Sequence, residues 1–237
     1  MDVIRPNWDV TGVSAFTTTA SNPWPVHWNE NPEREKNVQF FTKEYMLPAE
    51  PYWLKQTHSN TVVEMSKGLP FPMADASVAR EHGQVVAILT ADCLPILLAS
   101  EDKSTVCAVH AGWRGLATNI IEKSIYAMGI ARNNIQAWIG PCIHKNSFEV
   151  QQDFLSNLIS HGHTSELVYS FSNKIDSTHW YFDLVAFAEH MLVQSGLKKE
   201  KIYDSGYCTY TNSNEFHSHR RSQGKSKQRL VSLIWID

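Results

Sequence analysis

The sequence predicts an α+β fold in which mixed β-sheets are layered with helices. Residues 85–89, 95–99 and 105–110 are continuous apolar runs, as expected for strands that are buried on both faces. Helical periodicity begins only after these runs. Because the strands are clustered as well as interleaved with helices, we expect mixed sheets rather than one parallel sheet.

The elements follow in chain order. Residues 21–34 are rich in Asn, Pro and Trp and are expected to form a long irregular loop, and residues 62–65 are a short strand candidate. After the three apolar runs, one stripe with helical spacing predicts a helix over residues 116–128, which Gly129 ends. The stripe consists of Leu116, Ile120, Ile121, Ile125 and Met128.

The second half of the chain continues the alternation. Residues 135–139 and 230–236 predict buried strands, and residues 148–159 have the pattern of an amphipathic helix. Asp183 is placed to cap the N-terminus of a further helix, which Gly196 ends. No linker and no internal repeat divides the chain, so residues 1–237 are expected to form a single domain.

Composition narrows the class of protein. Hydrophobic residues make up 43% of the chain and charged residues 19%, which is a globular balance. The net charge of −3 gives no basic surface, so no nucleic-acid partner is expected. The N-terminus has no secretory signal, and the apolar stretch 85–99 is shorter than the roughly 20 residues of a membrane span. We therefore expect a cytoplasmic protein with a small-molecule substrate and no membrane partner; the oligomeric state is not indicated.

Three residues have the chemistry of metal ligands. His58, Cys93 and His110 each lie where a short stretch ends or turns, and Cys93 and His110 flank neighbouring apolar runs. Two imidazoles and a thiolate suit zinc, and three protein ligands leave the open position of a catalytic site. Each residue alone also fits an ordinary role, as a small core cysteine or a hydrogen-bonded histidine. The spacing leaves both interpretations open, because no local motif joins the three.

Several charged residues accompany this group. Asp92 precedes Cys93, where its carboxylate would orient a ligating imidazole or act as a base. Arg114, near the start of the predicted helix, suits an anion clamp, and the alternative is a solvent-facing side chain. Arg220 and Arg221 form a pair that is either ordinary surface or a clip for phosphate or carboxylate.

Four motifs in this order resemble the YfiH/DUF152 family: TADCLPILL, AVHAGWRGLA, IGPCI followed by FEV, and FHSHRR followed by RLVSLIW. Its members carry names such as multicopper polyphenol oxidase (laccase), purine nucleoside phosphorylase and peptidoglycan editing factor. The resemblance implies a layered α-β-β-α sandwich. It also implies a zinc site at His58, Cys93 and His110, with copper as the other metal to consider.

The chain departs from the family pattern in three places. The stretch 16–20 lacks the Arg and the glycines of the usual N-terminal motif. Asn146 and Ser147 stand where the family usually has a cysteine pair. His217 and His219 occupy positions where aromatic residues are usual. The first departure means that substrate contacts made by that Arg must be supplied by other residues here.

The resemblance implies a zinc-dependent purine nucleoside phosphorylase acting on adenosine, inosine and 5′-methylthioadenosine. Phosphate would be held by Arg114 with Arg220 and Arg221, and Asp92 and His219 are candidates for the acid that protonates the purine. The same metal would also support deamination of adenosine.

Three alternatives remain at this point. One is an amidase acting on a peptidoglycan precursor, with zinc-activated water or Cys93 as nucleophile. A second is a laccase, suggested by the His-X-His pairs at 161–163 and 217–219 but lacking a His-Cys-His bridge. The third is a binding module, which would require a fourth protein ligand on the metal.

Overall fold

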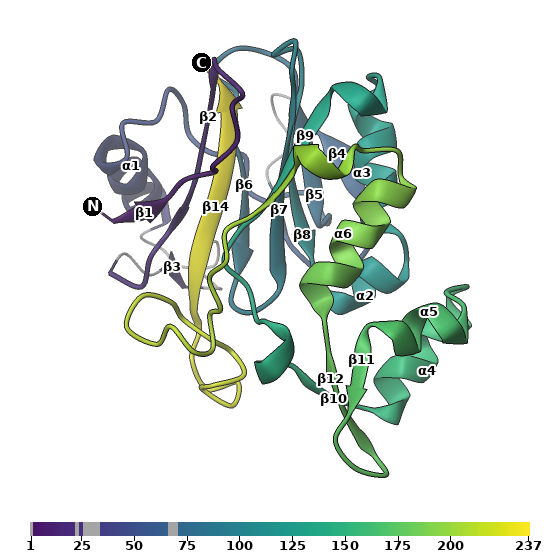
Figure 1. Cartoon of the computed structure of the whole chain (residues 1–237). Coiled ribbons are helices and arrows are strands. Elements are labelled where there is room, and N and C mark those ends of the chain that lie inside the picture. Colours follow the sequence, from purple (N-terminus) through teal and green to yellow (C-terminus); the bar gives the residue numbers. More distant parts are fainter. Residues whose placement is uncertain (1, 22–23, 26–33, 66–70) are drawn as a thin grey trace.

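Two large β-sheets packed face to face form the centre of the molecule, and helices cover both outer faces (Figure 1). The computed structural model describes residues 2–21, 24–25, 34–65 and 71–237. The order of layers is helix, sheet, sheet, helix, which confirms the predicted α+β sandwich with mixed sheets.

The first sheet is antiparallel and is built around the C-terminal strand. Its order is β1 (Val3–Ile4), β2 (Val13–Thr18), β14 (Gln228–Ile236) and β3 (Trp24–Pro25), and β6 (Val86–Thr90) also pairs with β14. Both β6 and β14 coincide with predicted strands, at 85–89 and 230–236. The two runs are almost entirely apolar, apart from the buried Ser232, because the sheet is covered on both faces.

The second sheet has six strands and is mixed. Its order is β13 (Ile202–Asp204), β9 (Ile135–Ile139), β7 (Leu94–Ser100), β8 (Val106–Ala111), β5 (Ala76–Ala79) and β4 (Val62–Glu64). The outermost pair at each edge is parallel, and the inner pairs are antiparallel. The strands predicted at 62–65, 95–99, 105–110 and 135–139 are all confirmed here.

Apolar side chains pack against both faces of the first sheet. Trp138 and Leu97 of the second sheet pack against Ile88 and Ile234 of the first. On the outer face of the first sheet, helix α1 (Arg34–Glu44) contributes Val38 and Phe41, among others, to a third cluster. Alanines in the facing strands allow the two sheets to approach closely.

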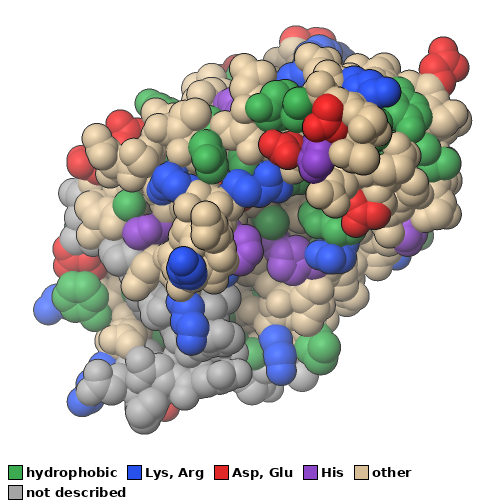
Figure 2. Space-filling model, turned by 90° about the horizontal axis from the view of Figure 1, so that it is seen from below, with side chains coloured by type: hydrophobic (Ala, Val, Ile, Leu, Met, Phe, Trp, Pro, Cys, Tyr) green, Lys and Arg blue, Asp and Glu red, His purple; other side chains and the backbone are tan. Residues whose placement is uncertain are grey.

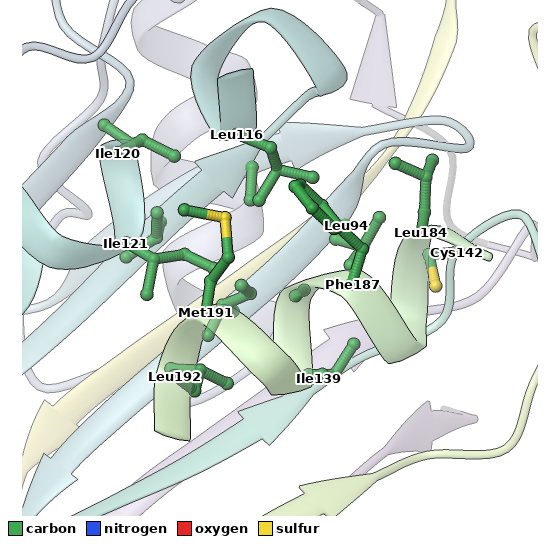
Figure 3. Close-up of a cluster of buried hydrophobic side chains, with 14 of the residues drawn as sticks. Leu94, Leu116, Ile120, Ile121, Ile139, Cys142, Leu184, Phe187, Met191 and Leu192 are labelled. Atoms are coloured by element: carbon green, nitrogen blue, oxygen red, sulfur yellow. The ribbon is translucent and has the colours of Figure 1, made fainter. Parts of the chain in front are cut away.

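Two helices cover the outer face of the second sheet. Figure 3 shows Ile120 and Ile121 of α3 (Ile120–Met128) and Phe187 and Met191 of α6 (Leu184–Gln194) in one buried cluster with Leu94 of the sheet. The ends of α6 agree with the predicted signals. Asp183 accepts a hydrogen bond from the Ala186 N–H at 3.0 Å, and Gly196 has a φ of +99° just beyond the helix.

The single helix predicted over residues 116–128 is wrong, because the structure divides it. Helix α2 (Trp113–Ala117) begins directly after β8, and α3 follows after a sharp break. The break lies at Asn119, whose φ of +64° is in the left-handed region. Apolar periodicity survives this two-residue break because both helices pack their apolar faces onto the same sheet.

The helix predicted over residues 148–159 is also corrected. Its first part is strand β10 (Glu149–Gln151), and α4 (Gln152–Ser160) follows it. Val150 pairs with Trp180 in a third, three-stranded sheet. The four-residue spacing of Val150 and Phe154 is helical, but the pairing with a distant strand overrides it. This sheet has the order β10, β12 (His179–Phe182) and β11 (Ser172–Lys174), with helix α5 (Ser165–Ser170) beside it.

Several elements were not predicted, namely β1, β2, β3, α1, β5, α5 and strands β11–β13. Short 3-10 turns occur at Arg132–Asn134, Lys145–Ser147 and Lys199–Lys201. The loop predicted for residues 21–34 falls largely outside the described residues, except for Ser21, strand β3 and the start of α1. No helix in the described part of the chain is long and apolar enough to span a bilayer.

The break at Asn119 gives a prediction about stability. Replacing Asn119 with Val places a β-branched side chain at positive φ, so we expect the free energy of unfolding to fall by about 1–2 kcal/mol. Asn119→Gly is the matched control, since it removes the same side chain without the backbone conflict. Urea denaturation of both variants measures the effect. Equal loss in the two variants would contradict the backbone explanation.

Candidate functional site

His58, Cys93 and His110 converge at one end of the second sheet. Cys93 directly precedes β7 and His110 lies near the end of β8, and these strands are antiparallel neighbours. His58 comes from the loop before β4. The candidate ligand atoms of the three residues all lie within 4.8 Å of one another, and Cys93 Sγ is 3.9 Å from His58 Nε2.

A buried carboxylate, Asp75, supports two of these three residues. Asp75 has no solvent exposure and lies directly before β5, the neighbour of β8. Its carboxylate is 2.8 Å from His110 Nδ1 and accepts hydrogen bonds from the backbone N–H groups of His58 and Ser59 at 3.0 and 2.6 Å. An Nδ1–H that donates to Asp75 leaves the lone pair of His110 on Nε2, the atom needed by a metal.

The same carboxylate holds an unusual turn. His58 has a φ of +60°, which a non-glycine residue adopts only when its surroundings enforce it. Asp75 also accepts a hydrogen bond from the Ser59 hydroxyl at 2.7 Å and from the Thr57 N–H at 3.2 Å. The turn therefore wraps around the carboxylate, and this places the imidazole of His58 opposite Cys93.

The electrostatics of the group favour a thiolate. Burial raises the pKa of Cys93, but the charges and hydrogen bonds of His110 and His58 outweigh it and lower that pKa to about 6. Burial lowers the pKa of His110, whereas Cys93 and Asp75 together raise it to about 9. Without a metal, Cys93 and His110 thus form a thiolate–imidazolium pair. The thiolate is the form of cysteine that binds metals.

Gly112 leaves space for an ion between the donors. A Cβ atom at this position would lie 2.8 Å from His58 Cδ2 and 3.4 Å from Cys93 Sγ, so any larger residue would fill the centre of the group. The donor set of one thiolate and two imidazoles suits zinc, and it also suits copper. The residues present therefore fit the metal that the sequence predicts, with one coordination position left over.

The metal-ligand group opens into a cavity of about 220 Å³. Figure 2 shows histidine side chains around a hollow on this face, with Lys and Arg side chains beside them. The cavity wall combines candidate metal ligands, arginine side chains and apolar side chains. Its lining residues are His58, Ala91, Asp92, Cys93, Trp113, Arg114, Ile143, Phe148, Leu184, His219 and Arg220.

Two arginines in this lining are each stacked on an aromatic ring. The guanidinium carbon of Arg114 lies 4.3 Å from the ring centre of Trp113, and that of Arg220 lies 5.2 Å from the ring centre of Phe148. Arg220 also donates a hydrogen bond to the Glu149 carbonyl at 2.9 Å. Stacking orients a guanidinium without using most of its N–H groups, which stay available for an anion.

Arg221 does not line this cavity, and its predicted role as a phosphate ligand is corrected. Its guanidinium donates to the backbone carbonyls of Thr209, Tyr210 and Phe216. These hydrogen bonds hold together the loop that carries its neighbour, Arg220. Arg221 is therefore a structural residue of that loop.

Asp92 lines the cavity, but its carboxylate does not orient an imidazole. It accepts hydrogen bonds from the Thr209 hydroxyl at 2.6 Å, the Ser218 hydroxyl at 3.0 Å and the Arg220 N–H at 2.6 Å. Asp92 thereby anchors the loop that presents Arg220 and the exposed His219. The imidazole-orienting role belongs to Asp75, which sequence reasoning missed. Its signal was a lone carboxylate in the apolar stretch MADASVA, where burial requires partners.

The His-X-His pairs do not add to this metal-ligand group. Within residues 2–21, 24–25, 34–65 and 71–237, one group of three or more His, Cys, Asp or Glu side chains has ligand atoms close enough to hold an ion. It contains His58, Cys93 and His110 only. The histidines at 161, 163, 217 and 219 lie outside it.

Asp75 yields a prediction about stability. Asp75→Asn removes the charge that accepts the hydrogen bonds of the 57–59 turn and of His110, so we expect the free energy of unfolding to fall by about 2–4 kcal/mol. Urea denaturation of the metal-free protein measures this. The control is Glu81→Gln at an exposed turn, which should change stability by less than about 0.5 kcal/mol. A similar small change in both variants would refute the role of Asp75.

Comparisons with known proteins agree with the resemblance. The family profile described as multi-copper polyphenol oxidoreductase laccase matches residues 11–237. A purine nucleoside phosphorylase of Xylella fastidiosa is 36% identical over 85% of this chain and 78% of that protein. Purine nucleoside phosphorylase YfiH of Shigella flexneri is 33% identical over 99% of this chain and 98% of that protein.

Solved structures have the same fold. A DUF152 protein of Neisseria meningitidis superposes with a TM-score of 0.88 at 30% identity, covering 100% of both chains. The YfiH protein of Bacillus licheniformis superposes with a TM-score of 0.84 at 21% identity, covering 95% of this chain and 93% of that chain. Together with the motifs around Cys93 and His110, these matches show that the chain belongs to the YfiH/DUF152 family.

Proposed function

We propose that this protein is a zinc-dependent purine nucleoside phosphorylase. One observation carries the proposal: the His58–Cys93–His110 group shares its cavity with two arginines that are stacked on aromatic rings. The names of relatives at 33–36% identity support a purine nucleoside phosphorylase activity. A cavity of about 220 Å³ lies below the roughly 300–1,000 Å³ of drug-sized sites, which favours a small substrate.

The reaction requires an anion site beside a site for a flat base. Arg114 and Arg220 would bind phosphate, and apolar lining residues such as Ile143 and Leu184 would contact the purine. Phosphate attacks the ribose C1′ while the bond from C1′ to the purine nitrogen breaks, and the purine leaves with a proton. His219 is exposed in the same cavity and is the candidate proton donor. Asp92 positions the loop that carries His219 and Arg220.

His58, Cys93 and His110 would hold the metal, with Asp75 and Gly112 keeping the donors in place. Bound there, zinc supplies a Lewis acid that polarises a substrate oxygen. The same donors also accept copper, so the metal must be identified by measurement.

Product analysis tests the activity. Zinc-loaded protein is incubated with adenosine, inosine and 5′-methylthioadenosine, with and without phosphate, and the products are separated by chromatography. We expect free purine and a sugar 1-phosphate only when phosphate is present. Inosine formed from adenosine, independent of phosphate, would add the proposed deaminase activity. No turnover of any nucleoside would refute the proposal, and peptidoglycan-precursor amides would then be the substrates to test.

Arg114→Ala distinguishes a phosphate site from a merely basic surface. Losing one charged hydrogen-bond donor costs about 1.5–3 kcal/mol, so we expect KM for phosphate to rise by roughly 10- to 100-fold. KM for the nucleoside should change less. Lys123→Ala, in an exposed position of α3, is the matched control and should leave both constants unchanged.

The metal assignment gives a separate prediction. We expect purified protein to contain about one zinc per chain by elemental analysis, and His110→Ala to lose most of it. Gly112→Ala should also weaken zinc binding, because the added methyl group displaces His58. Lys123→Ala, at an exposed position of α3, is the control and should keep the zinc content of the unchanged protein. Full zinc occupancy in His110→Ala would refute the ligand assignment.

A further inference from the structure

A second, larger cavity of about 560 Å³ lies behind the wall of the metal-site cavity. The wall consists of residues 143–148 and the start of α6, and neighbouring residues in it face opposite sides. Ile143, Phe148 and Leu184 line the metal-site cavity, whereas His144, Ser147 and Asp183 line the second cavity. The proposed function uses none of the residues that line the second cavity.

Cys208 lines this second cavity and lies opposite another cysteine in a β-bridge. Cys142 and Cys208 are direct partners in a parallel β-bridge, in which Cys142 exchanges backbone hydrogen bonds with Tyr207 and Thr209. Side chains of such partners point to the same side of the bridge. Neighbouring strands lie about 4.8 Å apart, within the Cα separation of roughly 4.4–6.8 Å that a disulfide spans.

The two thiols differ in reactivity. Burial raises the pKa of Cys208, but hydrogen bonds, the largest of them donated by the His144 N–H, outweigh it and lower that pKa. The Cys208 thiol itself donates to the Ser147 hydroxyl. Burial raises the pKa of Cys142, which has no solvent exposure. Cys208 therefore has the cavity access of an attacking thiol and a pKa shifted in the direction that favours attack, and Cys142, its partner in the bridge, lies where a resolving thiol is needed.

We propose that Cys142 and Cys208 are an oxidative modification site, which hydrogen peroxide reaches through the second cavity and converts to an intramolecular disulfide. The Cys208 thiolate attacks one peroxide oxygen, the O–O bond breaks, and the other oxygen leaves as water after protonation, giving a sulfenic acid. The Cys142 sulfur then attacks the Cys208 sulfur, the S–O bond breaks, and a second water leaves. Both sulfurs are oxidised and the peroxide is reduced to two waters.

The disulfide would join two segments that support the metal-site cavity. Cys142 precedes Ile143, which lines that cavity and whose N–H donates to the Asp92 carbonyl at 2.9 Å. Cys208 precedes Thr209, whose hydroxyl binds the Asp92 carboxylate. Oxidation at the second cavity thus acts on the backbone next to Asp92.

Peptide mapping tests the proposal independently of any enzymatic activity. Native protein is treated with hydrogen peroxide, its free thiols are blocked with N-ethylmaleimide, and tryptic peptides are analysed by mass spectrometry. Trypsin separates the two cysteines because Lys145 and Lys201 lie between them. We expect a linked peptide pair containing Cys142 and Cys208, lighter than the sum of the reduced peptides by two hydrogens and released by dithiothreitol.

Two variants and one internal control make the result decisive. In Cys142→Ala, peroxide should leave Cys208 as a sulfenic acid that dimedone traps; in Cys208→Ser, Cys142 should stay alkylatable only after unfolding. Cys107 is the internal control, because burial raises its pKa to about 12 and it should stay reduced. The proposal is overturned if Cys208 in the native protein stays reduced, or proceeds to sulfinic acid while Cys142 keeps its thiol.

Discussion

One buried carboxylate holds the candidate metal centre together. Asp75 receives hydrogen bonds from the turn that carries His58 and from the ring of His110, two segments separated by about fifty residues of sequence. The sheet order makes this possible, because β5 lies next to β8 and Asp75 immediately precedes β5. A buried charge with so many donors is stable, whereas the loss of its partners would leave it uncompensated. The geometry of the site and the stability of the sheet edge are therefore coupled.

A second carboxylate arranges the other side of the cavity in the same way. Asp92 has a φ of +87°, directly before Cys93, and receives three hydrogen bonds from the loop that carries His219 and Arg220. This strained backbone lies where the chain leaves strand β6 and begins to line the cavity. The cavity thus separates two tasks. Asp75 holds the candidate metal ligands His58 and His110 in place, and Asp92 holds the loop that carries His219 and Arg220.

Much of this architecture could be predicted because burial leaves a strong signal in the sequence. Strands covered on both faces are continuous apolar runs, so β6, β7, β8, β9 and β14 were predicted closely. The break at Asn119 and strand β10 could not be predicted, since both depend on contacts with distant segments. Arg220 and Arg221 are chemically identical neighbours, and only the path of their loop decides which one faces the cavity. The sequence showed three residues with the chemistry of metal ligands, but only the family motifs indicated that His58, Cys93 and His110 form one group.

The position of β14 has a consequence for biosynthesis. This strand, formed from the end of the sequence, lies between β2 and β6 in the first sheet. On the ribosome, β2 and β6 emerge early and have no central partner until residues 228–236 have been made. The early strands carry apolar residues on both faces, so the nascent chain exposes aggregation-prone surface until residues 228–236 have been made. Chaperone protection during translation is the expected requirement of such a topology.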